Sequence, residues 1–189
     1  MRIIGGQFRG RLLHMSLDKN TRPLKDLARE SIFNLLIHSK NISFELENSS
    51  ILDLYAGTGS FGLECLSRKA RKVCFVENEK NAVFILKKNI EKLKVKNKIK
   101  IHNGDATDFI KNKNSHEFKF NLIFCDPPFK DSSIETLIEI IFSKKILKNK
   151  GIIILHRNKN TNDSFPSFFE ILDEREYGIS KIIFGRLTA

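Results

Sequence analysis

The stretch Ile51-Leu-Asp-Leu-Tyr-Ala-Gly-Thr-Gly-Ser-Phe-Gly62 decides the fold, because an apolar run passes directly into a glycine-rich turn. Gly57, Gly59 and Gly62 have G-x-G-x-x-G spacing, which in a strand, turn and helix context can indicate a dinucleotide site. The residues that follow alternate between apolar runs of strand length and longer amphipathic segments, as in βαβ units. The sequence therefore predicts an α/β fold with a mostly parallel sheet.

The expected elements follow one another along the chain. Strands are expected at 51–55, 72–77, 98–102, 120–125 and 151–155, and helices at about 60–69, 79–94 and 132–143. Two further segments rich in β-formers, 168–177 and 179–186, are separated by Gly178 and predict a closing antiparallel hairpin. We therefore expect seven strands, of which the last two are antiparallel.

An N-terminal extension of residues 1–45 is expected before the main domain of residues 46–189. Gly5-Gly6 is expected to form a turn between the strand-like Arg2-Ile3-Ile4 and the stretch Phe8 to Met15, which predicts a β-hairpin. Asp26 is a suitable cap for a helix that runs to about Ser39. The small N-terminal unit is thus a hairpin and a helix.

Arginine is concentrated in this extension. The chain has 33 Lys and Arg against 22 Asp and Glu, a formal net charge of +11. Five of its arginines, Arg2, Arg9, Arg11, Arg22 and Arg29, lie in the first thirty residues, and Lys25 stands among them. This clustering indicates a polyanionic partner such as nucleic acid, and a solvated basic hairpin is the alternative.

The cysteines and the hydropathy indicate a cellular location. Cys65, Cys74 and Cys125 show no C-x-x-C spacing, so we expect free thiols in a reducing compartment. No apolar stretch approaches the ~18 residues of a membrane span, and the basic N-terminus lacks the hydrophobic run of a signal peptide. The protein is expected to be cytoplasmic.

Acidic residues end or follow four of the expected strands: Asp53, Glu77, Asp105 and Asp126. The carboxyl ends of parallel strands share one crevice, so these side chains should gather beside the glycines. A carboxylate at Asp53 would repel a pyrophosphate and attract a cation. S-adenosylmethionine carries a sulfonium and an ammonium and no phosphate. A nicotinamide dinucleotide remains open, because its enzymes place an acid where Glu77 stands.

The motif Asp126-Pro127-Pro128-Phe129 follows a buried strand and carries the most specific chemistry. The two prolines fix two φ angles, so the carbonyls point in set directions. Asp126 adds a carboxylate acceptor and Phe129 an aromatic face. This set suits a planar base with an exocyclic amino group, and a proline-stiffened turn is the alternative.

The order D-x-x-x-G-x-G, acidic strand end, G-D-A and D-P-P-F resembles the S-adenosylmethionine-dependent amino-group methyltransferases. The N-terminal blocks Met1 to Arg11, Thr21-Arg-Pro23 and Arg29 to Asn34 are similar to the bacterial RsmD family, the 16S rRNA (guanine(966)-N2)-methyltransferases. The resemblance runs over nearly the whole chain and includes Tyr177-Gly178. One departure is Leu24-Lys25-Asp26-Leu27, which stands where the family has small or hydroxyl residues and then Asp-Arg.

The resemblance implies a Rossmann-like class I methyltransferase fold and S-adenosylmethionine as methyl donor, with S-adenosylhomocysteine as product. Cofactor contacts are implied for Asp53, Tyr55, Gly57, Thr58, Gly59, Glu77, Asn78, Gly104, Asp105, Ala106 and Asp126. The target guanine would be held by Asp126, Pro127, Pro128 and Phe129, and the RNA by Arg2, Arg9, Arg11, Arg22, Lys25 and Arg29. The implied partner is 16S rRNA in an assembled small subunit or late precursor, bound by a monomer.

Three other functions remain open from the residues. The same acceptors could hold adenine N6 in DNA, and the same glycines could serve a nicotinamide-dependent oxidoreductase. The chain could also be an RNA-binding protein with an inactive fold, although the glycine loop and D-P-P-F are both intact. The five histidines are scattered, so no metal site is expected.

Overall fold

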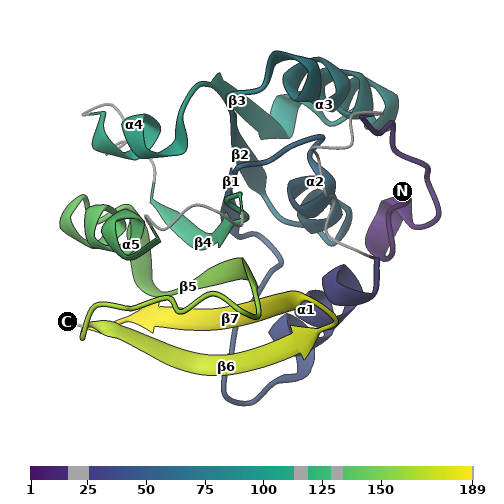
Figure 1. The fold of residues 1–189 in the computed structure, drawn as a ribbon. Helices are drawn as coiled ribbons and strands as arrows, with labels where there is room; N and C mark the ends of the chain where they lie inside the picture. The colour runs from purple at the N-terminus through teal and green to yellow at the C-terminus, as the bar shows by residue number, and fades with distance from the viewer. Residues whose placement is uncertain (17–25, 113–118, 129–133, 189) are drawn as a thin grey trace.

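The computed structural model describes residues 1–16, 26–112, 119–128 and 134–188. A seven-stranded sheet organises them in the order β3-β2-β1-β4-β5-β7-β6 (Figure 1). Its strands are β1 (Ser50–Leu54), β2 (Lys72–Glu77), β3 (Ile99–Asn103), β4 (Phe120–Cys125), β5 (Leu147–Asn158), β6 (Phe169–Tyr177) and β7 (Ser180–Leu187). The first five are parallel, and β7 pairs antiparallel with both β5 and β6. The predicted α/β fold with its C-terminal hairpin is confirmed.

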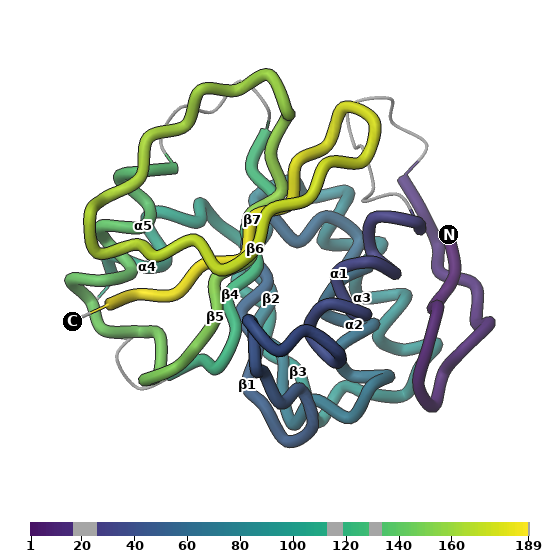
Figure 2. Tube along the Cα trace, turned by 90° about the horizontal axis from the view of Figure 1, so that it is seen from below, coloured from purple at the N-terminus to yellow at the C-terminus, as the bar shows by residue number. Residues whose placement is uncertain are grey.

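Helices cover both faces of the sheet. They are α1 (Asp26–His38), α2 (Ser60–Ser67), α3 (Lys80–Leu93), α4 (Ala106–Lys111) and α5 (Ile134–Ser143), with 3₁₀ turns η1 (Gly6–Phe8) and η2 (Lys96–Lys98). Figure 2 shows α1, α2 and α3 on one side of the sheet and α4 and α5 on the other. All five residues of β1 are buried, as expected for a strand with helices on both sides.

Alternate residues of the central strands enter two hydrophobic clusters, one on each face. Ile51 belongs to the cluster under α1, α2 and α3, whereas Leu52 belongs to the cluster under α4 and α5. In the first cluster the ring of Phe61 stacks on Phe124 with centroids 3.9 Å apart, and on Phe33 at 5.3 Å. This stack joins α1, α2 and β4.

Three elements differ from the sequence prediction. Strand β5 begins at Leu147 rather than 151, and its pairing with β4 shifts register near Phe120. Helix α4 was not expected, because its single turn and a half is too short to give a periodic pattern. The two arms of the N-terminal hairpin pair through the Arg2–Leu12 bridge and through hydrogen bonds from the Ile3 amide to the Arg11 carbonyl at 2.9 Å and from the Leu13 amide to the Met1 carbonyl at 3.0 Å, and the connection between them is the unpredicted turn η1.

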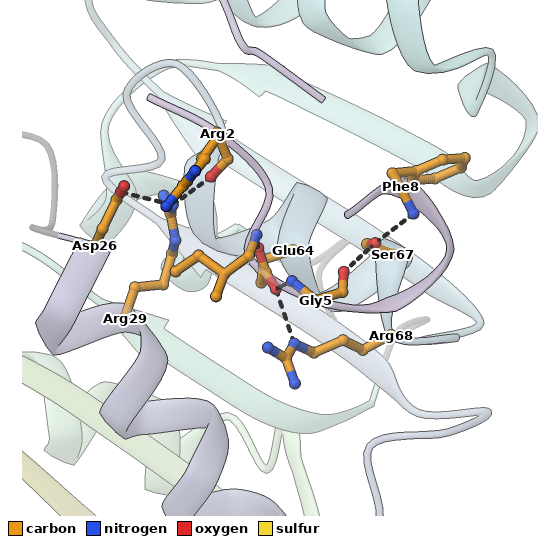
Figure 3. Close-up of polar contacts among 9 residues, drawn as sticks. Arg2, Gly5, Phe8, Asp26, Arg29, Glu64, Ser67 and Arg68 are labelled. Atoms are coloured by element: carbon orange, nitrogen blue, oxygen red, sulfur yellow. Dashed lines mark hydrogen bonds and ion pairs between the residues drawn. The ribbon is translucent and has the colours of Figure 1, made fainter. Parts of the chain in front are cut away.

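The N-terminal segment is fastened to helix α2 by the buried carboxylate of Glu64 (Figure 3). Its oxygens accept hydrogen bonds from the backbone amides of Ile4 and Gly5, each at 2.7 Å, and from Nε of Arg68 at 2.8 Å. The amide of Phe8 donates to Ser67 Oγ at 2.9 Å. These bonds satisfy backbone groups that have no strand partner.

The same segment contributes to the hydrophobic core. Ile3 and Leu13 are buried in one cluster with Ala28 of α1 and Ile51 of β1. The extension and the sheet therefore share apolar contacts, and the domain boundary near residue 45 stays a prediction.

Arg29 corrects one expectation about RNA contact. Its side chain is 0% exposed, and Nη2 donates to the Arg2 carbonyl at 2.6 Å and to Asp26 Oδ1 at 2.9 Å (Figure 3). Burial lowers the pKa of this guanidinium. The prediction that Arg29 contacts RNA is wrong, because a fully enclosed side chain cannot reach a phosphate; instead it joins α1 to the N-terminal segment.

The cysteines are free, as predicted. Cys65 and Cys125 are buried, and burial raises the pKa of Cys74 to about 12, so its thiol stays protonated at neutral pH. In the part of the chain that the structure describes, no helix is both long and apolar enough to cross a membrane.

We predict that Glu64→Gln destabilises the protein by about 1–3 kcal/mol, because an amide NH2 would face a backbone N–H that now donates to a carboxylate oxygen. Urea unfolding measures the change. Glu47→Gln is the matched control, since Glu47 forms an exposed ion pair with Lys69 at 3.5 Å and should cost less than about 1 kcal/mol. Equal effects of the two substitutions would contradict the assigned role of Glu64.

Candidate active site

The candidate site lies where the strand order reverses. Strand β1 is flanked by β2 on one side and by β4 on the other, and the chain continues from β1 to β2 but from β4 to β5. Such a switch point leaves a crevice at the carboxyl ends of the strands, where open α/β sheets bind ligands. The loop after β1 and the segment Asp126 to Pro128 after β4 line this place.

The loop after β1 has a backbone that only some residues tolerate. Tyr55, Gly57 and Gly59 have φ values of +59°, +54° and +86°. A Cβ on Gly59 would lie 2.3 Å from Leu86 Cδ1, whereas a Cβ on Gly57 would meet nothing within 4 Å. Gly59 therefore serves close packing, and Gly57 leaves its backbone open to the approach of a ligand.

Glu77 at the end of β2 holds this loop in place. Its carboxylate accepts from the amide of Gly57 at 2.6 Å and from the amides of Asn78 and Glu79, each at 2.9 Å. A carboxylate offers about four acceptor positions, so roughly one remains for a ligand hydroxyl. Glu77 lies at the end of β2 beside the glycine loop, and its contact with ribose stays a prediction.

Asp53 lies beneath the loop. Its carboxylate is buried, and Oδ2 accepts from the amide of Gly62 at 2.9 Å. Burial raises the pKa of Asp53 well above its usual value, and the negative charges of Asp126 and Glu77 raise it further. The three carboxylates are therefore close enough to repel one another, and a cation bound above the loop would relieve this repulsion.

The acid after β3 caps a helix. Asp105 Oδ1 accepts from the amides of Thr107 at 2.7 Å and Asp108 at 3.0 Å, at the start of α4. Gly104 connects the strand to this cap, and its amide donates to the Glu77 carbonyl at 3.0 Å. Both capping bonds use Oδ1, so Oδ2 can accept from a ligand amine. The buried Ala106 that follows belongs to the helix.

Asp126 occupies the switch point itself. Its side chain is 22% exposed, and its amide lies 3.5 Å from the Leu54 carbonyl of β1. Oδ1 is 2.7 Å from Nδ1 of His156 on β5. Pro127 is buried and Pro128 is exposed. Phe129 falls outside the described residues, so its predicted stacking is a proposal.

The sequence reasoning missed His156 as a member of the site. From the sequence, the histidines are weighed only as metal ligands, although His156 follows an apolar run as Asp126 does. Asp126 and His156 each come directly after the last residue pair of the parallel strands β4 and β5. That position was the available signal that the two side chains are neighbours.

A second missed residue, Asn89 of α3, joins the glycine loop to the N-terminal segment. Its Nδ2 donates to the Thr58 carbonyl at 3.0 Å and to the His14 carbonyl at 3.1 Å. Its Oδ1 accepts from the His14 amide at 2.7 Å. Because Asn89 is fully buried, this amide rigidly connects the predicted cofactor loop with the predicted RNA-contacting segment.

The predicted RNA-contacting residues are distributed unevenly. Arg2, Arg9 and Arg11 are exposed, and the Arg11 guanidinium lies 5.7 Å from the centroid of the Phe8 ring. Arg22 and Lys25 fall outside the described residues.

The donor and acceptor pattern favours a cationic ligand without phosphate. A dinucleotide would need free amides at the glycine loop and at the start of α2. The amides of Gly57 and Gly62 already donate to the carboxylates of Glu77 and Asp53. The crevice thus presents acceptors where a pyrophosphate needs donors, whereas sulfonium, ammonium and hydroxyl groups fit it.

The same fold occurs in methyltransferases. The solved structure of the yhhF protein from Escherichia coli superposes with a TM-score of 0.85 at 29% identity, covering 100% of this chain and 98% of that one. A Streptococcus mutans structure described as a candidate S-adenosylmethionine-dependent methyltransferase gives 0.64 at 16% identity, covering 80% and 48%. The fold is therefore the Rossmann-like fold of the class I S-adenosylmethionine-dependent methyltransferases.

Sequence comparison identifies the family. The family described as Conserved hypothetical protein 95 matches residues 1–186. "Ribosomal RNA small subunit methyltransferase D" of Haemophilus influenzae is 33% identical over 180 residues, covering 95% of this chain and 90% of the relative. The protein of that name in Escherichia coli strain K12 is 33% identical over 179 residues, covering 94% and 85%. The chain belongs to this family, the RsmD family, as the sequence resemblance predicted.

We predict that Asp53→Asn raises the melting temperature near neutral pH. The raised folded-state pKa means that the stability contribution of Asp53 is present below about pH 3.8 and is lost as the pH rises toward the folded-state value. A neutral amide can still accept from the Gly62 amide and avoids the buried charge. Thermal unfolding of wild type and variant between about pH 5 and pH 8 measures this gain.

The exposed Glu170→Gln is the control and should leave the pH dependence of stability unchanged. A stability difference between Asp53→Asn and wild type that does not vary with pH would contradict the prediction.

Proposed function

We propose that this protein is an rRNA methyltransferase that transfers a methyl group from S-adenosylmethionine to the exocyclic N2 of an unpaired guanine of 16S rRNA, of the position 966 type. The observation that carries the proposal is the partly exposed Asp126 carboxylate at the switch point, with one oxygen held by His156. The names of the relatives support the rRNA substrate. We expect a monomer acting in the cytoplasm on an assembled small subunit or late precursor.

The proposed cofactor site follows the edge of the sheet from β1 to β3. The loop from Tyr55 to Gly59, above the buried Asp53, would receive the methionine part. Glu77 and Asn78 would hold the ribose, and Asp105 would accept from the adenine amino group. When bound, S-adenosylmethionine supplies an electrophilic methyl group on a sulfonium.

Asp126 has the properties needed to activate an aromatic amine. The lone pair of guanine N2 is delocalised into the ring, so the nitrogen is a poor nucleophile until acceptors hold its hydrogens and favour a pyramidal geometry. Asp126 and the Pro127 carbonyl would be these acceptors, and Asp126 would take the proton that nitrogen loses. Catalysis then comes from orientation and electrostatics, with no covalent intermediate.

The target base has to leave the helical stack. N2 of a paired guanine is hydrogen-bonded, so the base must be unpaired or flipped. Phe129 would stack on it, an interaction worth about 1–3 kcal/mol in single-stranded recognition. The same acceptors could hold adenine N6, and nucleoside analysis separates the two products.

We predict that Asp126→Ala lowers kcat for methyl transfer at least about 10²-fold and changes the Kd for S-adenosylmethionine by less than about threefold. Transfer of labelled methyl to small subunits that lack the modification, followed by digestion of the rRNA, measures rate and product together. N2-methylguanosine is the expected product, and calorimetry gives the cofactor affinity.

Asp108→Ala, at an exposed position of α4, is the matched control and should retain activity. N6-methyladenosine as the product would overturn the choice of base. Loss of cofactor binding in Asp126→Ala would overturn the role assigned to Asp126.

We predict that Arg9→Ala and Arg11→Ala each weaken RNA binding at low salt and reduce the slope of log K against log salt by about one. Both side chains are exposed, so protein stability and cofactor affinity should not change. Filter binding over a range of salt concentrations measures the slope. The exposed Lys96→Ala on η2 is the control, and an effect as large as that of Arg9→Ala would argue against a specific N-terminal contact.

A further inference from the structure

The register of three neighbouring strands brings Asp126, His156 and Ser180 together. Strands β4 and β5 are parallel, with Cys125 opposite Leu155, so the next residues, Asp126 and His156, lie side by side. Strands β5 and β7 are antiparallel, with His156 opposite Ile182 and Asn158 opposite Ser180. His156 and Ser180 are therefore diagonal neighbours on one face of the sheet.

Their side chains form a continuous hydrogen-bonded chain. His156 Nδ1 is 2.7 Å from Asp126 Oδ1, and His156 Nε2 is 2.8 Å from Ser180 Oγ. The His156 side chain is 5% exposed, so it sits behind the more accessible carboxylate. Among the residues that the structure describes, His156 is the side chain that contacts the Asp126 carboxylate.

The Asp126 carboxylate determines which ring nitrogen must carry a proton. An ionised carboxylate can only accept, so Nδ1 must carry a proton and donate it to Asp126. In the neutral ring Nε2 is then an acceptor, and the Ser180 hydroxyl can donate to it. Ser180 thus stabilises the tautomer that serves Asp126.

We propose that His156, oriented by Ser180, is a positioning residue for Asp126. The inference rests on the proposed function and adds to it a reason for the direction of the carboxylate. With Oδ1 occupied by His156, the rotation of the carboxylate is restricted, and Oδ2 is left to accept from the amine of the target base. A misplacement of about 1 Å at such a group can cost 10²-fold in rate.

The proposal has a kinetic test. We expect His156→Ala to lower kcat by about 10–100-fold while the Kd for S-adenosylmethionine stays within about threefold of wild type. His156→Asn can place an amide N–H near the position of Nδ1, so it should recover most of the lost rate. His156→Gln places its amide nearer to Nε2 and should not recover it.

Ser180 and an exposed histidine complete the kinetic set. Ser180→Ala should lower kcat less than His156→Ala does, and the double variant should equal His156→Ala, because Ser180 acts through the ring. His38→Asn, at the exposed end of α1, should behave as wild type. Equal losses in His156→Asn and His156→Ala, with unchanged melting temperatures, would overturn the positioning role.

A spectroscopic test does not require activity. Nitrogen-15 NMR of the imidazole rings, with His156→Asn used to assign the signal, should show His156 protonated at Nδ1 in wild type. Asp126→Ala should shift the ring toward the Nε2–H form. A wild-type ring protonated at Nε2 alone would overturn the inference even if the enzyme is active. If the wild-type protein transfers no methyl group to rRNA although the Nδ1–H signal is present, the proposed function would be overturned instead.

Discussion

The parallel pairing of β1 with β2 on one side and with β4 on the other is the constraint on which the rest of the structure depends. This pairing brings the carboxyl ends of all three strands to one edge of the sheet. There the connection after β1 runs toward β2, and the connection after β4 runs the opposite way toward β5. The switch point, with Tyr55 after β1 and Asp126 after β4, follows from this topology. Asp53, Glu77, Asp105 and Asp126 are each placed by a strand end or by the turn that follows it.

Three carboxylates at this edge repel one another, and the protein offsets that repulsion with backbone amides. Glu77 accepts three of them and Asp53 one, so the glycine loop is shaped by the acids around it. The burial of Asp53 opposes stability, as the direction of its pKa indicates. In the part of the site that the structure describes, the amides of Gly57 and Gly62 already donate to carboxylates, and this pattern suits a cationic ligand better than a phosphate.

The N-terminal segment links the predicted RNA surface to this site. Glu64 holds the backbone of the segment against α2, and Arg29 joins it to α1. Asn89 then connects it to the glycine loop through Thr58. The exposed Arg9 and Arg11 thus lie on a rigid segment. This rigidity favours RNA binding in one orientation over non-specific electrostatic attraction.

The sequence by itself determined the succession of strands and helices along the chain, the glycine loop, the acidic strand ends and the closing hairpin. These features depend on local patterns and turn chemistry. The sequence did not distinguish exposed arginines from Arg29, since burial is decided by distant segments. Nor could it find the contacts of His156 with Asp126 and Ser180, which arise from the register of three strands. Local propensity selects the elements, and only their packing in three dimensions decides which polar groups meet.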